Sequence, residues 1–378
     1  VKLMADVGAN AMHANIEYEL NERICYDRVH AALAEKEKRL FGHHDQCLIR
    51  PGRVVTNAGE GYKVFSAFKR AFITSFELHG RSLYNLPSKQ VSVDYPSDLS
   101  ALDKVVTWDS AWASGEDEAH DRLNRFIETD VRQYDRCRDM PAVEGTSALS
   151  PYLAVGILST RQCLQAALIE NNGRLSEGKP GVDMWVNELL WREFYRHILF
   201  FHPRLCKHEP FKTSTDNIGW STNKETLTLW IEGKTGFPIV DAAMRQLKET
   251  GWMHNRLRMV AAMFLTKDLM VDWRLGEQYF MSQLVDGDFA SNNGGWQWSA
   301  STGVDAVPYF RVFNPIRQSE RFDPDGHFIR KYIPELADIP IKHLHFPHDY
   351  IEQQGLDVYW QPLVDHKSAR LRAIAFYK

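Results

Sequence analysis

The residues whose types and spacing best suit chemistry lie in one polar and aromatic stretch, DGDFASNNGGWQW, at residues 286–298. The stretch is too polar for a protein core and too aromatic for an ordinary loop. Its two aspartates, neighbouring amides and Gly-Gly pair are typical of groups that converge on a ligand with many hydrogen-bonding atoms. The aspartates lack the spacing of a calcium-binding EF-hand loop. We therefore predict a ligand-binding loop and no metal site.

A second candidate surface lies on the helix that the hydrophobic periodicity predicts over residues 183–201. At helical spacing, one face of this helix carries Glu188, Trp191, Arg192 and Tyr195. A carboxylate and a guanidinium among aromatic rings suit a flat polar ligand such as a nucleobase. The alternative is a solvent-exposed Glu188–Arg192 pair beside aromatic residues of the core.

Two arginines lie near the start of another predicted helix, over residues 253–272. Arg258 shares a face with Asn255 and Met259, whereas Arg256 points elsewhere. The positive end of a helix dipole disfavours cations, so anions from a partner are expected here. One arginine could neutralise a ligand anion and the other a nucleic-acid phosphate. Solvated arginines are the alternative.

A smaller phosphate signal lies at residues 146–151, TSALSP. Ser150 suits a helix N-cap and Pro151 the first helical position. The free N–H groups of such a helix start, with the hydroxyls of Thr146 and Ser147, would suit a phosphate. The alternative is an ordinary capped helix.

The elements that must position these residues are mostly helical. Residues 1–79 mix strands and helices and indicate a partial α/β domain whose sheet is incomplete. Residues 80–118 lose periodicity and are interpreted as an interdomain linker. From 119 to 378 nearly every periodic segment predicts a helix, including one over 151–170, which indicates an all-α domain.

Composition narrows the class of protein. Hydrophobic residues make up 44% and charged residues 25%, as in an ordinary globular protein. No stretch approaches the roughly 20 apolar residues of a membrane span. Five cysteines without a C-x-x-C pair favour reduced thiols and a cytoplasmic protein. With a net charge of −4, any nucleic-acid contact must come from a local basic patch.

These segments together closely resemble the class I photolyase and cryptochrome family, and within it the bacterial cyclobutane pyrimidine dimer photolyases. The resemblance runs from about Glu17 to the C-terminus and is most specific at Trp185–Arg196, Lys234–Arg258 and Asp286–Ser299. It implies a helical domain that holds FAD in a folded conformation. The implied FAD contacts are Tyr134, Thr146, Ser147, Ala148, Leu149, Ser150, Trp185, Asn255, Arg258, Asp286, Gly287, Asp288 and Asn292.

The resemblance also implies roles outside the flavin site. The positions that match the DNA surface or the flipped-out dimer are Arg138, Glu188, Trp191, Arg192, Tyr195, Arg256, Met259, Trp298, Arg311 and Gln318. Those that match the chain that re-reduces oxidised flavin are Trp296, Trp273 and Trp220. A folate antenna would contact Asn21, Glu22 and Lys207, but the other wall of that site is not recognisable and the antenna is left open.

The function implied is light-driven splitting of pyrimidine dimers in UV-damaged DNA, with Glu188 and Asn292 as active-site residues, in a bacterial monomer. A cryptochrome with FAD and no repair is the competing interpretation. The resemblance favours a photolyase, because Asn292 matches the residue that photolyases place near flavin N5. An NADPH-dependent flavin oxidoreductase is disfavoured, because no G-x-G-x-x-G follows a predicted strand.

Overall fold

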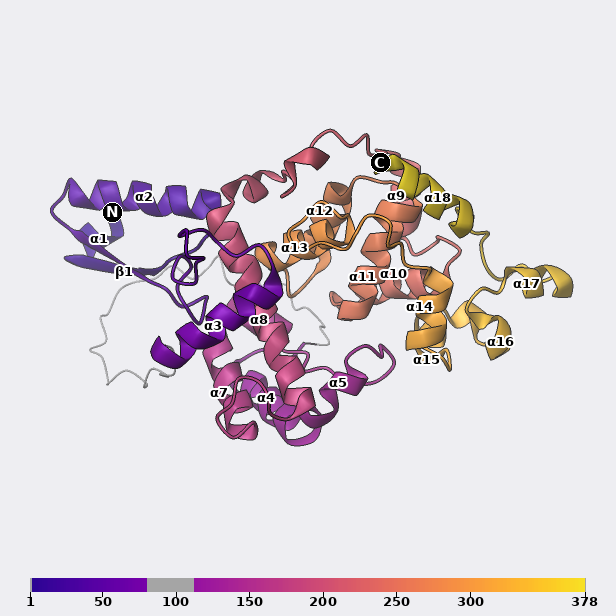
Figure 1. Cartoon of the computed structure of the whole chain (residues 1–378), viewed down its shortest axis with the longest axis horizontal. Helices are drawn as coiled ribbons and strands as arrows, with labels where there is room; N and C mark the ends of the chain where they lie inside the picture. Colours follow the sequence, from indigo (N-terminus) through magenta and orange to yellow (C-terminus); the bar gives the residue numbers. More distant parts are fainter. Residues whose placement is uncertain (1, 80–111, 378) are drawn as a thin grey trace.

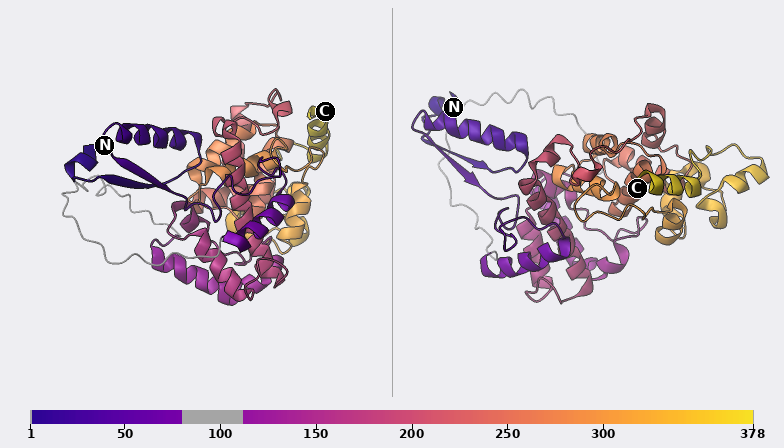
Figure 2. Two further views of the ribbon diagram at one scale, coloured as in Figure 1. Left: turned by 60° about the vertical axis from the view of Figure 1, so that its left-hand side comes forward. Right: turned by 45° about the horizontal axis from the view of Figure 1, so that its top comes forward.

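The structure, a computed structural model, describes residues 2–79 and 112–377. Its first part is a small parallel sheet made of β1 (Ala11–Asn15) and β2 (Arg39–His43), preceded by α1 (Lys2–Asp6). Parallel strands need a crossover connection, and α2 (Leu20–Ala34) provides it. The sheet and α2 project to one side of the helical body in all views (Figure 1 and Figure 2). The predicted α/β character of this part is confirmed.

A second segment of the N-terminal part packs directly on the helical body. α3 (Phe65–His79) presents Phe68, Phe72 and Phe76, which are buried and spaced four residues apart, so that they form one apolar stripe. The stripe packs against the central helix α8 (Pro180–Phe201), where the rings of Phe68 and Phe194 lie 5.3 Å apart.

The rest of the described chain is helical, as predicted. Its remaining α-helices are α4 (Glu116–Thr129), α5 (Tyr134–Cys137), α6 (Ser150–Val155), α7 (Thr160–Glu170), α9 (Lys224–Ile231), α10 (Pro238–Thr250), α11 (Asn255–Met263), α12 (Trp273–Gln283), α13 (Phe289–Ser299), α14 (Pro315–Phe322), α15 (His327–Tyr332), α16 (Ile341–Leu344), α17 (His348–Gln354) and α18 (His366–Phe376). Among the described residues, none of the helices has the length and apolarity needed to cross a membrane.

Three predicted boundaries differ from the structure. The helix predicted over 151–170 is broken at Gly156, whose φ of 78° ends α6, and α7 begins anew with a capping box between Ser159 and Gln162. The helix predicted over 253–272 ends its α-helical part at Met263 and continues as a π-helical turn. The predicted linker lies largely outside the described residues, and its described end already contains the start of α4 at Glu116.

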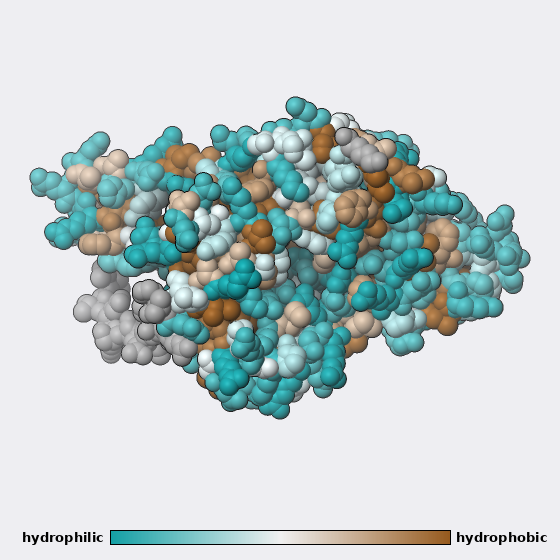
Figure 3. All heavy atoms as spheres, viewed as in Figure 1, coloured by the Kyte–Doolittle hydropathy of each residue, from teal (hydrophilic) through white to brown (hydrophobic). Residues whose placement is uncertain are grey.

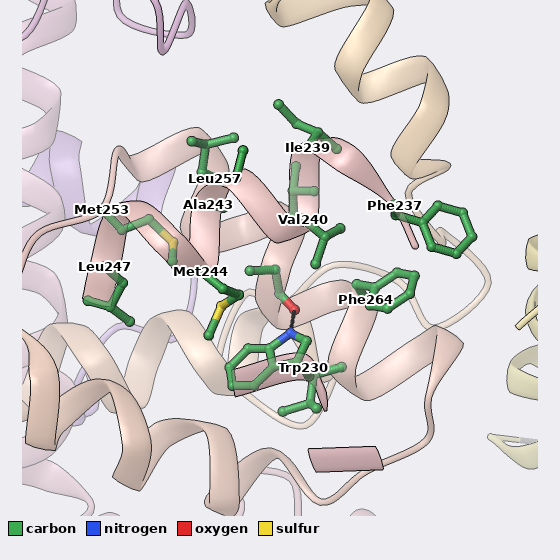
Figure 4. Close-up of a cluster of buried hydrophobic side chains, with 14 of the residues drawn as sticks. Trp230, Phe237, Ile239, Val240, Ala243, Met244, Leu247, Met253, Leu257 and Phe264 are labelled. Carbon is green, nitrogen blue, oxygen red and sulfur yellow. Dashed lines mark hydrogen bonds between the residues drawn. The ribbon is translucent and has the colours of Figure 1, made fainter. Parts of the chain in front are cut away.

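The helical part has two hydrophobic clusters. One surrounds α3, α7 and α8; the other surrounds α10, α11 and α12. Figure 4 shows the second, where Trp230 packs among Val240, Met244 and Phe264, and its indole N–H donates to the carbonyl of Ala261 at 3.2 Å. α13 contacts α8, α11 and α12, so it lies where the two clusters meet and where the predicted site residues converge.

Candidate flavin and DNA site

A cavity of about 150 Å³ lies against α11, α12 and α13. The predicted site residues that line it are Asn255, Arg258, Met259, Asp286, Asp288, Asn292 and Trp296. They come from two segments that are separate in the sequence, 255–259 and 286–296, which is the convergence expected of a ligand site. The face shown in Figure 3 is largely hydrophilic and is hollowed near the middle of the helical body.

The stretch predicted as a ligand-binding loop is mostly helix, so the predicted loop is wrong, although its residues do line the cavity. Asp288 is the N-cap of α13, and its carboxylate accepts from the N–H of Ser291 at 2.8 Å. The Gly-Gly pair lies inside the helix, and the two glycines have different surroundings. A Cβ on Gly294 would lie 2.3 Å from the Tyr195 ring, so the glycine lets α13 approach α8. Gly295 faces the cavity, where a Cβ would meet nothing within 4 Å.

The strongest polar feature of the cavity is the pair Arg258–Asp286. A terminal guanidinium nitrogen of Arg258 donates to Asp286 Oδ2 at 2.7 Å, and Nε donates to the carbonyl of Met253 at 2.7 Å. Asp286 is buried, and its Oδ1 has no hydrogen-bond partner among the described residues. A buried acceptor without a partner is costly. The pair therefore fits a ligand that offers both a negative charge to Arg258 and a donor to Asp286.

The second aspartate is held differently. Asp288 is paired with Arg196 of α8 in addition to its capping bond. Burial by itself raises the pKa of Asp288, but Arg196 and Arg192 outweigh it and leave the pKa below its usual value. The carboxylate therefore stays ionised beside the cavity.

Asn292 lies on the cavity face of α13 with one end of its amide already used. Its Nδ2 donates to the backbone carbonyl of Glu277 at 3.0 Å. The amide is thereby oriented with its carbonyl oxygen left to accept. Behind it, Asn293 donates to the buried carboxylate of Glu277 at 2.7 Å, which fixes α13 against α12.

A larger cavity of about 460 Å³ touches the predicted phosphate segment. Thr146, Ser147 and Ala148 line it together with Arg125 and Lys331. Ala148 has a φ of 47°, a strained conformation for a residue with a Cβ, of the kind that concentrates at ligand sites.

Ser150 is the first residue of α6 rather than its N-cap, which is Leu149, so the predicted cap is wrong by one position. The Ser150 hydroxyl instead accepts from the Trp252 indole at 3.2 Å. Two further predicted FAD contacts, Tyr134 and Trp185, are buried, and both pack on Phe126.

The side chains on the face of α8 that was predicted to meet a base do not all point to one place. Glu188 is half-buried and paired with Arg138, and burial raises its pKa although Arg138 opposes the rise. Trp191 stacks on Phe65 with ring centroids 3.7 Å apart. Arg192 points away, because its guanidinium donates to the carbonyl of Gln46 at 2.8 Å.

The alternative Glu188–Arg192 pair is therefore wrong, and the structure does not bring the Arg192 guanidinium to Glu188. Tyr195 packs against Gly294 of α13 and Trp191, and it helps to hold the two helices together.

The predicted DNA residues gather in part. Arg256 and Arg138 meet at Asp139, and the guanidinium of Arg256 lies 4.4 Å from the ring centroid of Phe322 in α14. Gln318 belongs to the same helix α14, and its side-chain oxygen has no partner among the described residues. Arg311 is exposed in the segment before α14.

Of the three tryptophans that the resemblance assigns to flavin reduction, Trp296 is the one that lines the cavity. Trp296 lines the cavity and is buried, Trp273 is fully buried, and Trp220 is half-buried. α12 approaches Trp296 through Gly276, where a Cβ would lie 2.1 Å from the indole. The Trp220 segment is tied to the chain just before α12, because Ser221 donates to the carbonyl of Met270 at 2.8 Å.

The predicted antenna residues lie near one another. Asn21 and Glu22 are in the first turn of α2, and Lys207 is exposed. The neighbouring Cys206 is hydrogen-bonded to the backbone of Leu20, which brings the two segments together.

Sequence reasoning missed two residues of the site. Arg196, which pairs with Asp288, was part of a recognised motif, and its position one turn after Arg192 was the available signal. Asp139 gave no signal, because nothing in the sequence around it predicts a contact with Arg256.

Comparison with known proteins agrees with this geometry. A family model described as the FAD binding domain of DNA photolyase matches residues 185–378, and a model described as DNA photolyase matches residues 1–88. The chain is 46% identical to the deoxyribodipyrimidine photo-lyase of Escherichia coli, over 100% of this chain and 80% of that protein.

Solved structures give the same result for the fold. A bacterial class III photolyase from Agrobacterium tumefaciens has a TM-score of 0.86 at 35% identity. The match covers 100% of this chain and 80% of the photolyase chain. A cryptochrome from Synechocystis has a TM-score of 0.85 at 26% identity and covers 99% of this chain and 80% of its own. The cavity, its FAD-binding family model and the relatives lead to one conclusion: the chain belongs to the DNA photolyase family and binds FAD.

Proposed function

We propose that this protein repairs cyclobutane pyrimidine dimers in DNA by a light-driven reaction. The observation that carries the proposal is the cavity in which Arg258, the unpartnered oxygen of Asp286 and the oriented amide of Asn292 face one ligand space. These groups fit the polar edge of a flavin, whose reduced form, when bound, supplies the electron that opens the cyclobutane ring. Arg258 offers positive charge to an anionic ring, and Asn292 offers a carbonyl oxygen to a ring N–H.

The remaining FAD contacts follow from the second cavity. Thr146, Ser147 and the strained Ala148 line it, and their hydroxyls and backbone N–H groups suit the FAD phosphates. Lys331 and Arg125 add positive charge on the same cavity.

The residues proposed to recognise the lesion are Glu188 and those that the family resemblance assigns with it. Trp191, Met259 and Trp298 offer two indoles and a thioether, which suit stacked pyrimidines. Glu188 would bond the base edge of a dimer; one of its two carboxylate oxygens, Oε1, is paired with Arg138. The family acts on pyrimidine dimers by flipping them out of the duplex, and a dimer stacks poorly, so flipping costs less than for a normal pair.

The cryptochrome alternative shares the fold, as the Synechocystis structure illustrates. Asn292 favours repair, because its oriented amide is the group that photolyases place near flavin N5. We also propose that the protein is a monomer in the bacterial cytoplasm, and its elution volume tests the oligomeric state. The folate antenna at Asn21, Glu22 and Lys207 is left open, and absorbance of the protein mixed with a reduced folate tests it.

The central test is product analysis. Reduced protein is illuminated with oligonucleotides that carry either a cyclobutane dimer or a (6-4) photoproduct, and the products are separated by chromatography. We expect restoration of the cyclobutane substrate alone, because the lesion-facing set has Glu188 as its ionisable group and no histidine for acid chemistry. His254 is buried as the N-cap of α11, where its Nδ1 accepts from Arg256 N–H at 3.2 Å. Restoration of the (6-4) substrate would contradict the assignment, and failure on both substrates would favour the cryptochrome.

DNA affinity should fall steeply with salt although the protein has a net charge of −4. Each neutralised phosphate contributes about −0.9 to the slope of log affinity against log salt. We expect Arg256→Ala and Arg311→Ala each to flatten that slope by about one unit. Fluorescence anisotropy at several salt concentrations measures the slope, and Arg370→Ala on α18 is the control. Unchanged slopes in both variants would place the DNA surface elsewhere.

A further inference from the structure

The arginines at the predicted DNA surface share a carboxylate. Asp139 Oδ2 accepts from a terminal nitrogen of Arg256 at 2.8 Å, and Asp139 Oδ1 lies 3.8 Å from Nε of Arg138. Arg138 comes directly after α5 and Arg256 from the first turn of α11, so Asp139 joins two elements that are far apart in the sequence. An acidic side chain is unexpected on a surface that must receive a polyanion, because it repels phosphate and lowers affinity.

The environment of the three side chains indicates a fixed arrangement. The side chains of Arg138 and Arg256 are each 17% exposed, and that of Asp139 is 34% exposed. Arg256 is held on its other side by the ring of Phe322, and Arg138 by Glu188. Asp139 therefore links the two arginines in a row of alternating charges, in the order Glu188, Arg138, Asp139 and Arg256.

The two arginines can keep their carboxylate partners and still bind DNA. A guanidinium has five N–H donors, and Arg256 uses one terminal nitrogen for Asp139. Asp139 therefore need not be displaced when a phosphate arrives. It fixes the direction in which the free donors point.

We propose that Asp139 is a positioning residue for lesion recognition, which holds Arg138 and Arg256 at a set spacing that fits the distorted backbone around a flipped-out dimer. This inference rests on the proposed function, because it assigns a use to the DNA surface named there. Without Asp139 the arginines remain available to any phosphate but lose their common geometry. Binding of dimer-bearing DNA is then weakened, because the arginine pair is no longer preorganised. Binding of undamaged DNA is strengthened, because a charge that repels phosphate is gone.

The two effects have opposite signs, which makes them separable. In Asp139→Ala we expect affinity for undamaged duplex to rise slightly and affinity for a duplex with one cyclobutane dimer to fall. The dissociation constant for undamaged duplex divided by that for dimer-bearing duplex should fall about tenfold. This is the size expected when two long side chains must be ordered on binding. Asp139→Asn keeps one carbonyl acceptor for Arg256 and should give an intermediate ratio.

The measurement uses flavin-loaded protein in the dark, with fluorescence anisotropy on matched duplexes with and without the dimer. Asp135→Ala is the control, because Asp135 lies on α5 close to Asp139 and its loss changes the net charge equally. It should leave the ratio unchanged. Flavin content and melting temperature of each variant report on folding, and Asp139→Asn keeps the test valid if the alanine variant folds poorly.

The outcomes separate the inference from the function beneath it. A ratio in Asp139→Ala equal to that of Asp135→Ala, or equal rises in both affinities, would overturn the positioning role alone. A wild-type protein that does not prefer dimer-bearing DNA would overturn the proposed function and, with it, this inference. A selective loss of dimer affinity in Asp139→Ala, with Asp135→Ala unchanged, supports both.

Discussion

Replacing Trp296 by phenylalanine should abolish light-driven reduction of oxidised flavin and leave repair by chemically pre-reduced protein nearly intact. Trp296 is the one tryptophan of the predicted series that lines the cavity, so we expect an electron from Trp273 or Trp220 to reach a bound flavin through it. It is not among the residues proposed to contact the lesion. Its loss should therefore prevent reduction of the oxidised flavin and leave repair by the already reduced flavin unaffected.

The measurement is the absorbance of bound flavin under blue light with an external reductant, beside repair assays after dithionite reduction. Trp230→Phe is the matched control, because Trp230 is equally buried and its ring lies 6.0 Å from that of Trp296, but it is outside the predicted series. It should still photoreduce. Both substitutions are milder than truncation to alanine, which costs about 3–5 kcal/mol at buried aromatic positions. Equal loss of photoreduction and repair in the Trp296 variant would contradict the assigned role.

The sequence was most informative where side-chain chemistry and helical spacing agreed. Asn255, Arg258 and Met259 were predicted to share a face, and all three line the cavity. The aspartates at 286 and 288 were predicted to converge on a ligand, and both line the same cavity. Periodicity also predicted the helical character of the region after residue 119.

It was least informative where a long side chain chose among distant partners. Helical spacing places Arg192 one turn from Glu188, but the reach of a guanidinium lets it bond the carbonyls of Gln46 and Leu153 instead. Those partners belong to segments whose position depends on tertiary packing, which spacing along one helix does not encode. The contact between Asp139 and Arg256 was missed for the same reason.

The helix at 289–299 was missed because its glycines were interpreted as part of a ligand-binding loop. In the structure Gly294 answers a packing requirement, because it admits the ring of Tyr195, whereas Gly295 borders the open space of the cavity. A glycine pair is compatible with a helix when a neighbouring element supplies stabilising contacts, and α8, α11 and α12 all contact α13. The cost, about 1 kcal/mol per glycine relative to alanine, is local.

The largest effect on stability and cofactor binding is expected from Arg258→Met. The side chain of Asp286 is 3% exposed, and Arg258 is its charged partner at 2.7 Å. Removing one partner of a buried ion pair leaves an uncompensated charge, which costs about 3–5 kcal/mol. We expect the free energy of unfolding of the flavin-free protein to fall by about that amount, and the purified variant to lose most of its flavin.

A double substitution separates the two effects. In Arg258→Met with Asp286→Leu the buried charge is removed together with its partner, and apolar replacements of buried pairs are often neutral or stabilising. Stability should therefore return toward the wild-type value in denaturant titrations. Flavin binding should not return, because both groups that face the ligand are gone. A double variant that retains flavin at wild-type affinity would show that the pair serves the fold alone. An unchanged stability of the Arg258→Met variant would show that Asp286 finds another partner when Arg258 is removed.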